Sequence, residues 1–463
     1  MPVAPRGPDG SLSPDSWPVA HAAARRLLSP ITRFLRIEAA SGLLLLAAAL
    51  TALVWANSPL AGAYHDLWDA PLAFRLGSLE VDRPLHFWVN DGLMTIFFFV
   101  VGLEVRREIH EGELCDLRRA ALPLAAAVGG MAVPAVIYAA FNVGGAGGPG
   151  WGIPMATDIA FAVGVLTLLG NRIAPALRVL LLALAVIDDI GAILVIAIFY
   201  SSGISFAWLG LGALATGAVL VLRALGVRRP VIYLAPGVAL WACVYRAGIH
   251  PTLAGVVLGL LTPVRSWYGA QGAARSLRGH ADALPGASED ELVEHIESIR
   301  RVQSETISPA ASLQHLLHPW VAFLIMPLFA LANSGVQLGG ATFAGDGWRV
   351  LVGVVAGLVI GKPIGVFIAS RSAIGARLSV RPRDVGDRGL AVVGVVAGIG
   401  FTMSLFIAQL AFPPGPLLET AKLAILVASG SAILLGLIGG ALTLPRLRRE
   451  VASESDAERG ADV

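Results

Sequence analysis

Long apolar runs dominate this chain and limit what it can fold into. A helix needs about 20 consecutive apolar residues to cross the hydrocarbon core of a bilayer, and twelve runs approach that length, each bounded by Arg, Pro or Gly clusters. We therefore predict an all-α integral membrane protein with twelve transmembrane helices. The predicted spans are 38–56, 84–104, 121–142, 152–170, 177–200, 205–222, 230–245, 248–263, 317–334, 349–370, 390–412 and 417–443.

The composition excludes other classes of protein. Apolar residues make up 56% of the chain and charged residues only 14%, whereas soluble chains average about 25% charged residues. Too few polar side chains remain to cover several soluble domains, to keep a chain disordered or to bind nucleic acid. The two cysteines, Cys115 and Cys243, fall at opposite sides of the predicted membrane, so we expect no disulfide between them.

The distribution of Lys and Arg predicts the orientation. Cytoplasmic connections retain positive charge, and 28 of the 34 basic residues lie in the two tails and in every second connection. We therefore place both termini in the cytoplasm. Residues 1–35 are expected to form a largely disordered tail, residues 36–445 the transmembrane domain, and residues 446–463 a charged tail.

Two segments between the spans have patterns of their own. Residues 74–83 alternate apolar and polar side chains around a Gly-Ser turn, which predicts an extracytoplasmic β-hairpin. Residues 264–316 form a long cytoplasmic insert. Within it, Ser288 and Glu291 have the spacing of a capping box and precede apolar residues at helical spacing, so we expect an amphipathic helix there.

A few ionisable residues lie inside or beside the predicted spans. A charge at the bilayer centre costs about 2.5–3.5 kcal/mol, so such residues usually line a polar cavity or an ion path. The alternative is a structural ion pair. Glu104 and Glu108 flank two arginines at a cytoplasmic mouth and are equally typical of charges at the headgroup level. The seven residues are Asp91, Glu104, Glu108, Asp158, Asp188, Asp189 and Lys362.

Three of these residues are predicted near the middle of the membrane. Asp188 lies ten residues beyond Arg178, about 15 Å at ~1.5 Å per residue, and Lys362 is similarly far from the nearest arginines. Neighbouring helix positions point about 100° apart, so Asp188 and Asp189 cannot both face one partner. One carboxylate can pair with Lys362 while the other binds a hard cation and exchanges it for a proton. A lysine can also release its proton, which an arginine does not.

Helix breakers accompany polar residues in the fourth and eleventh spans. Pro154 precedes Thr157 and Asp158, and the eleventh span contains Gly398 and Gly400. Backbone groups freed at this depth are tolerated where they line a cavity or meet polar partners, so these spans are predicted to be interrupted. A simple proline kink with a satisfied threonine is the alternative for the fourth span.

Several motifs in one order resemble the bacterial NhaA sodium/proton antiporter family. The resemblance covers residues 36–445. Its motifs are Val101-Gly-Leu-Glu-Val-Arg106, Ala156-Thr-Asp-Ile-Ala160, Ala185-Val-Ile-Asp-Asp-Ile-Gly191, His250-Pro-Thr-Leu-Ala254, His318-Pro-Trp320, Gly361-Lys-Pro-Ile-Gly365 and Gly398-Ile-Gly-Phe-Thr-Met-Ser404.

The resemblance implies an inverted-repeat fold, with interrupted spans 4 and 11 crossing near the aspartates. It implies Na⁺ binding at Asp189 and Asp188, with Lys362 paired to Asp188 and with Thr157 and Asp158 supporting the crossing. It further implies electrogenic exchange of sodium or lithium for protons across the bacterial inner membrane, without a cofactor, and a homodimer formed through the 74–83 hairpin. Candidates for the pH response are Asp91, Glu104, Arg107, Glu108 and His250.

One segment departs from the family pattern. The family has a short loop with Glu and His before the ninth span, whereas residues 264–269 contain neither and a long insert follows, roughly residues 268–312. The insert's own acids and His295 are possible substitutes in pH sensing.

We therefore hypothesise an antiporter, not an enzyme, with two rivals. An intramembrane aspartyl enzyme would also use buried acids, but the chain has no Gly-x-Gly-Asp motif and no Tyr-Asp pair. A proton-coupled carrier of another small solute would need a wider polar lining than these few residues provide.

Overall fold

The computed structural model describes residues 38–76, 79–201, 203–227, 230–266, 269–284, 288–379, 381 and 384–445. Within these ranges the regular structure is helical apart from one two-stranded hairpin. The tails predicted at 1–35 and 446–463 fall outside the described residues.

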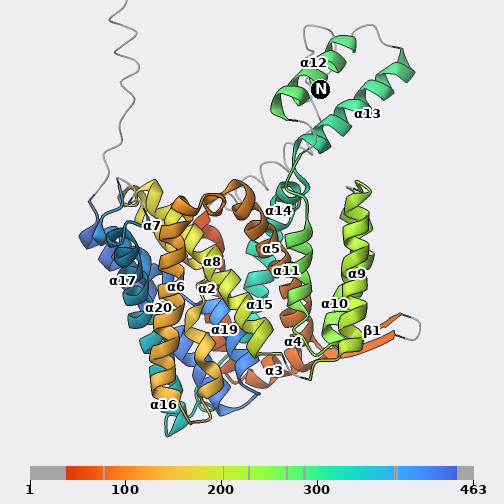
Figure 1. Cartoon of the computed structure of the whole chain (residues 1–463). Coiled ribbons are helices and arrows are strands. Elements are labelled where there is room, and N and C mark those ends of the chain that lie inside the picture. The colour runs from red at the N-terminus through yellow and green to blue at the C-terminus, as the bar shows by residue number, and fades with distance from the viewer. Residues whose placement is uncertain are drawn as a thin grey trace, which may run out of the picture.

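Long apolar helices lie side by side in one bundle (Figure 1). In the described residues, eight segments are long and apolar enough to cross a membrane, and two bent helix pairs raise the number to ten. The predicted spans at 230–245 and 248–263 correspond to the shorter apolar helices Val231–Arg246 and Thr252–Leu261. The structure thus supports a multi-span membrane bundle without fixing the number at twelve.

The helical elements follow one another with few long connections. In the first half of the chain they are α2 (Glu38–Ala56), α3 (Ala61–Asp69), α4 (Leu85–Phe87), η2 (Trp88–Leu93), α5 (Met94–Glu111), η3 (Glu113–Cys115), α6 (Leu117–Asn142), η4 (Gly148–Met155), α7 (Ile159–Leu169), η5 (Gly170–Arg172), α8 (Pro175–Phe199) and α9 (Phe206–Ala224). In the second half they are η6 (Pro230–Tyr233), α10 (Leu234–Arg246), α11 (Thr252–Leu261), α12 (Ala270–Ala283), α13 (Glu289–Thr306), α14 (Pro309–Trp320), η7 (Val321–Ile325), α15 (Met326–Asn333), α16 (Asp346–Ala356), η8 (Gly357–Gly361), α17 (Lys362–Gly375), α18 (Asp387–Ala397), α19 (Phe401–Ala411) and α20 (Pro416–Thr443).

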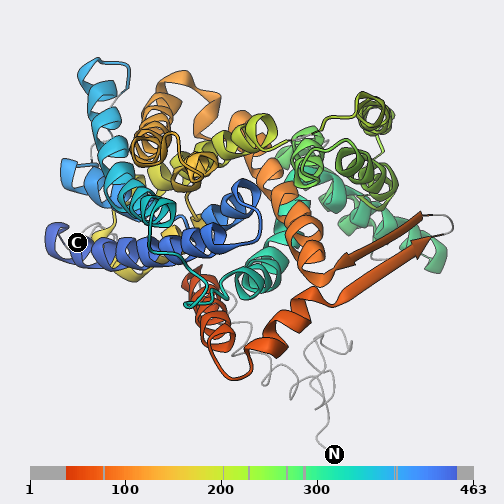
Figure 2. The ribbon, with the colours of Figure 1, turned by 90° about the horizontal axis from the view of Figure 1, so that it is seen from below.

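A β-hairpin marks one end of the bundle, which we call the hairpin end. Strand β1 (Pro71–Leu76) pairs antiparallel with β2 (Leu79–Pro84), with Pro71 opposite Pro84. The hairpin projects sideways from the helices (Figure 2). At its base, Arg83 Nη2 donates to Tyr245 Oη over 2.5 Å, and the Trp88 indole donates to the Leu72 carbonyl. These contacts tie the hairpin to α10 and η2.

The helices α12 and α13 project from the opposite end, which we call the insert end (Figure 1). Helix α13 begins directly after Ser288, whose backbone N–H and hydroxyl both donate to the Glu291 carboxylate. These two donors hold the pKa of the Glu291 carboxyl below its usual value. The local sequence therefore supplies the start of α13 without help from the bundle.

Small residues let the helices at the centre approach closely. Helices α6 and α17 touch at Gly129 and Gly365, where a Cβ on either glycine would lie within 2.3 Å of the other's carbonyl oxygen. Membrane helices pack by such close backbone contact because lipid supplies no hydrophobic drive between them. This contact places Lys362, at the start of α17, in the bundle core.

Candidate functional site

Two non-helical stretches meet inside the bundle, and we call their meeting point the crossing. One stretch, 156–158, separates η4 from α7, and the other, 398–400, separates α18 from α19 with a bend of 46°. The Asp158 N–H donates to the Ile399 carbonyl over 2.7 Å. The Thr157 hydroxyl lies 2.9 Å from the Ala397 carbonyl oxygen. The freed backbone groups of each stretch are thus partly satisfied by the other.

Asp158 joins the amino-terminal ends of two helices. Its Oδ1 accepts from the Phe161 N–H over 3.1 Å, so it caps α7. Its Oδ2 accepts from the Thr402 N–H over 3.1 Å and also from the Thr402 hydroxyl, at the start of α19. A carboxylate here offsets the partial positive charge of both helix ends.

A glycine at position 398 allows close packing of the crossing against η8. A Cβ at position 398 would lie 2.5 Å from the Leu358 carbonyl oxygen of η8. Backbone atoms cannot yield as a flexible side chain can, so only glycine fits beside η8 without a shift.

Asp188 and Lys362 form a fully buried ion pair next to the crossing. Lys362 Nζ lies 2.9 Å from Asp188 Oδ2, and neither side chain is exposed. The same oxygen accepts from the Thr157 hydroxyl over 2.7 Å, and Lys362 also donates to the Met155 carbonyl. Helices α8 and α17 are therefore joined to the 155–157 segment by one shared set of polar contacts.

Asp189 differs from its neighbour because, within the described residues, no basic group forms an ion pair with it. The side chain is buried, with 1% of its surface exposed, and within the described residues its Oδ1 accepts no hydrogen bond. The carboxylates of Glu104, Asp188 and Asp158 act on it electrostatically, opposed by Lys362. With all its groups ionised, the cluster of Asp158, Asp188, Asp189 and Lys362 has a net charge of −2. Such a cluster can hold a monovalent cation or protons.

Three of the pH-response candidates lie on α5 toward the insert end. Glu104 lies among the carboxylates that act on Asp189. Arg107 is exposed and lies 4.0 Å from the Glu111 carboxylate. Glu108 accepts the Glu113 N–H over 2.8 Å, where the helix ends. The structure thus brings Glu104 toward the buried cluster and leaves Arg107 at the surface.

The other two candidates lie near the hairpin end. His250 Nδ1 is 4.0 Å from Asp91 Oδ1, and the side chains are 25% and 20% exposed, respectively. Asp91 belongs to η2, whose π-helical turn interrupts the regular ladder of the span. The five pH-response candidates therefore form two separate groups and not one site.

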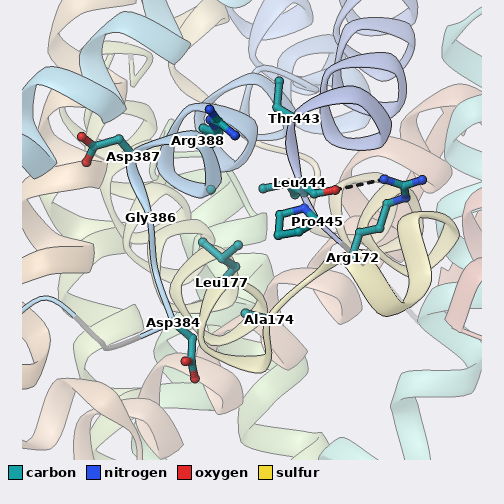
Figure 3. Close-up of a pocket in the computed structure, with 11 residues that line it drawn as sticks. Arg172, Ala174, Leu177, Asp384, Gly386, Asp387, Arg388, Thr443, Leu444 and Pro445 are labelled. Atoms are coloured by element: carbon teal, nitrogen blue, oxygen red, sulfur yellow. Dashed lines mark hydrogen bonds between the residues drawn. The ribbon is translucent and has the colours of Figure 1, made fainter. Parts of the chain in front are cut away.

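A surface pocket lies elsewhere. It has a volume of about 410 Å³ and forms where α8 and α18 begin and α20 ends (Figure 3). Arg172 lies at one side and its guanidinium donates to the Leu444 carbonyl over 3.0 Å. None of the ten predicted site residues lines this pocket, and the buried cluster of Asp158, Asp188, Asp189 and Lys362 lies apart from it.

Sequence reasoning missed the uncharged partners of the site. It gave no role to the Met155 carbonyl or to Thr402, which hold Lys362 and Asp158. It also considered, inside the spans, only charged residues and the residues beside helix breakers, and so passed over a group of amides on η2, α15 and α19. The available signal was the presence of Asn and Gln in otherwise apolar runs.

Fold and site together define a class of protein. A multi-span helical bundle that buries three carboxylates and one lysine at a crossing of non-helical backbone is an integral membrane protein with the features of an ion transporter.

Comparison with known proteins gives the family. The sequence profile described as Na+/H+ antiporter 1 matches residues 32–439. The "Na(+)/H(+) antiporter NhaA 2" of Sorangium cellulosum is 52% identical over 450 residues, covering 96% of each chain. The protein of that name from Myxococcus xanthus is 51% identical over 97% of each chain. The "Na(+)/H(+) antiporter NhaA" of Bordetella petrii is 48% identical over 96% of this chain and 97% of its own.

This chain belongs to the NhaA family of Na⁺/H⁺ antiporters. The resemblance predicted from the motifs is therefore confirmed. The family consists of secondary transporters, so the alternative of an intramembrane enzyme is wrong.

Proposed function

We propose that this protein expels sodium or lithium in exchange for protons by alternating access. Asp189 is the principal cation ligand, Asp188 assists, and both sodium and protons are substrates, so that no cofactor is needed. The observation that carries the proposal is Asp189 itself, a buried carboxylate whose Oδ1 accepts no hydrogen bond within the described residues, next to Asp188, which is paired with Lys362.

Competition at one site is sufficient for exchange. A buried carboxylate that is charged and unpaired is costly, so Asp189 holds either a cation or a proton when the site crosses the membrane. An empty charged site is disfavoured from crossing, which suppresses leak of one ion without the other. Sodium suits oxygen ligands of this kind because it is a hard cation, like those that carboxylates and carbonyls hold elsewhere.

The Asp188–Lys362 pair adds a second protonation. If Lys362 releases its proton while the cation is bound, two protons exchange against one sodium ion and each cycle moves charge. Lysine suits this role because its ammonium group can be deprotonated when it is desolvated. Among 34 basic residues only Lys362 and Lys422 are lysines, and one of them occupies this position.

We propose the finer architecture on the same basis. Helices α10 and α11 complete a set of twelve spans, with spans 3–5 and 10–12 as inverted repeats and spans 4 and 11 interrupted at the crossing. The distribution of basic residues supports cytoplasmic termini in the bacterial inner membrane. The sideways projection of the hairpin supports a homodimer formed through β1 and β2 (Figure 2).

We propose a pH response in two parts. Glu104 acts on Asp189 through its charge. Protonation of Glu104 therefore weakens the electrostatic repulsion that the ionised Asp189 carboxylate experiences. The second part is the pair of Asp91 and His250 near the hairpin end, whose side-chain atoms lie 4.0 Å apart. The insert helices α12 and α13 project from the end of the bundle that we place in the cytoplasm, so they are exposed to the cytoplasmic pH.

Sodium-induced proton movement tests the function. Everted vesicles from cells without other antiporters are energised to form a pH gradient, and sodium, lithium or potassium is then added across a range of pH. We expect sodium and lithium to dissipate the gradient with the wild type and to have no effect with Asp189→Asn. The matched control is Asp66→Asn on the exposed face of α3, which should behave as the wild type.

Each outcome separates the parts of the proposal. If neither cation moves protons at any pH with the wild type, the proposed exchange is wrong. If Asp189→Asn exchanges normally, exchange stands but the ligand assignment is wrong. Western blotting of the vesicles, or a fluorescent tag, shows that the variant is inserted at the wild-type level.

A further inference from the structure

We propose that a gate of two layers closes the route from the crossing to the hairpin end, and that it must part before the cation can leave on that side. One layer is aromatic (Phe98, Phe329 and Phe406) and the other is polar (His86, Asn90, Asn333 and Gln409). The inference rests on the proposed exchange by alternating access and assigns the residues of the gate.

The aromatic layer lies nearer the crossing. The Phe406 ring lies 5.3 Å from the Phe98 ring and 6.2 Å from the Phe329 ring, measured between centroids. All three side chains are at most 1% exposed. They come from α19, α5 and α15, so this layer joins three elements that are far apart in sequence. Where buried apolar side chains of this kind line an ion route, they stop hydrated ions.

The polar layer lies one or two helical turns further toward the hairpin end. Asn90 Nδ2 donates to Gln409 Oε1 over 2.7 Å, and Asn333 Nδ2 donates to Asn90 Oδ1 over 2.8 Å. Gln409 also donates to Asn333 Oδ1, and His86 Nε2 lies 2.9 Å from the same oxygen. Asn333 is completely buried and Asn90 is 7% exposed.

On both α19 and α15, the polar residue lies one helical turn beyond the phenylalanine. Gln409 follows Phe406 by three residues, and Asn333 follows Phe329 by four, so each polar group lies one turn beyond its phenylalanine on the same helix face. Asn90 precedes Phe98 by eight residues on the span that runs in the opposite direction. The three elements therefore present an apolar contact and then a polar contact in the same order.

The gate is linked mechanically to the crossing through α19. Thr402, which holds Asp158, lies seven residues before Gln409 on that helix, about 10 Å at ~1.5 Å per residue. A shift of the crossing on exchange of ions moves α19 relative to α5 and α15. Both layers are formed between α19 and the segments of these two other spans, so the shift acts on the contacts of both layers. The polar layer is also free of carboxylates, so its amides can exchange partners with a passing ion without holding it strongly.

Reducible cross-linking tests whether these contacts must part. Cysteines replace Asn333 and Gln409 in a background with Cys115→Ser and Cys243→Ser, and a short bis(methanethiosulfonate) joins them. We expect cross-linked protein in proteoliposomes to lose on the order of tenfold or more of its sodium–proton exchange and to regain it on reduction. Sodium binding should persist, because the cross-link lies on the hairpin side of the crossing and leaves Asp188 and Asp189 unchanged.

The matched control joins two residues that we expect to move together. The Thr342 N–H and the Thr420 hydroxyl are 3.0 Å apart near the hairpin end, between the loop before α16 and helix α20. A Thr342→Cys/Thr420→Cys pair treated in the same way should exchange normally. The single-cysteine variants show the effect of the reagent alone. Cross-linked Asn333/Gln409 protein that exchanges at the rate of its reduced form would overturn the gate.

A second variant tests the aromatic layer without sodium and without cross-linking. Phe406→Ala removes the ring that joins Phe98 and Phe329, so water should enter and the vesicles should lose an imposed pH gradient without added cation. The control is Phe199→Ala, since that ring is 61% exposed on the outside of α8. A gradient held by Phe406→Ala as well as by the wild type contradicts the aromatic layer. Because this arm needs no sodium, failure of the gate is distinguishable from failure of the proposed exchange.

Discussion

Asp188 and Asp189 show how one step along a helix places two carboxylates in different surroundings. Successive positions point about 100° apart, so Asp188 faces Lys362 and Thr157 while Asp189 has no partner within the described residues. The same two acids at a spacing of three or four residues would face one partner and compete for it.

Replacement of Lys362 by arginine tests whether this residue must lose a proton. Lys362→Arg retains the positive charge beside Asp188 but does not titrate, so we expect exchange to fall on the order of tenfold and to become less dependent on pH. The control is the other lysine of the chain, Lys422, which is paired with Glu419 over 3.0 Å at the start of α20. Lys422→Arg should exchange normally in the vesicle assay, whereas normal exchange by Lys362→Arg would remove the role of lysine deprotonation.

Single residues in the sequence indicate much of the site's chemistry, but they do not reveal which residues contact one another. Counting residues from the flanking arginines places Asp188 and Lys362 at similar depth, and an acid and a base inside apolar runs indicate a functional role. The sequence does not reveal that Thr402 holds Asp158 or that the Met155 carbonyl receives Lys362. Those contacts depend on how two distant segments approach each other, and no local pattern encodes that.

At the scale of elements, glycines determine where helices come into contact. The Gly129–Gly365 contact holds α17 against α6 and thereby positions Lys362. Pro154 and the 398–400 segment likewise mark where the helical conformation stops. Breakers of this kind can be recognised in the sequence, whereas the partner of Gly129 cannot, because Gly365 lies more than 200 residues away.

The Gly365→Ala variant tests this contact. Its Cβ would lie 2.1 Å from the Gly129 carbonyl oxygen and 3.0 Å from Val133 Cβ, so the helices must separate. We expect a loss of about 1–3 kcal/mol in stability, typical of overpacking, and slower exchange. The control Gly375→Ala, on the same helix, meets nothing within 4 Å and should be neutral or slightly stabilising. Equal melting temperatures for the two purified variants would contradict the close contact.

At the scale of the whole molecule, the two ends of the bundle have different structures. The hairpin end presents the sideways projection of β1 and β2, and the insert end presents α12 and α13 (Figures 1 and 2). The local sequence predicts strands and a capped helix at these places, and strand pairing in fact reaches from Pro71 to Pro84, beyond the predicted 74–83. Tyr245 and Trp88 form hydrogen bonds with this base of the hairpin, and no local pattern reveals those contacts.

Shortening of the hairpin tests the proposed dimer. Replacement of residues 72–82 by a short glycine linker should convert the dimer to a monomer, measured by native mass spectrometry, and should leave exchange in vesicles because every proposed ligand comes from one chain. Deletion of the insert helices α12 and α13 is the matched change at the other end, and it should leave the dimer intact and alter the pH profile alone. A shortened protein that remains dimeric would exclude the hairpin as the contact.

The most direct measurement concerns competition at Asp189. Purified protein in weakly buffered detergent solution is mixed with sodium chloride at constant ionic strength, and released protons are followed with a pH indicator. If sodium and protons share this carboxylate, the wild type releases protons as sodium saturates the site, and Asp189→Asn releases none. Equal proton release by both proteins, or sodium binding by the wild type without any release, would contradict competition at Asp189.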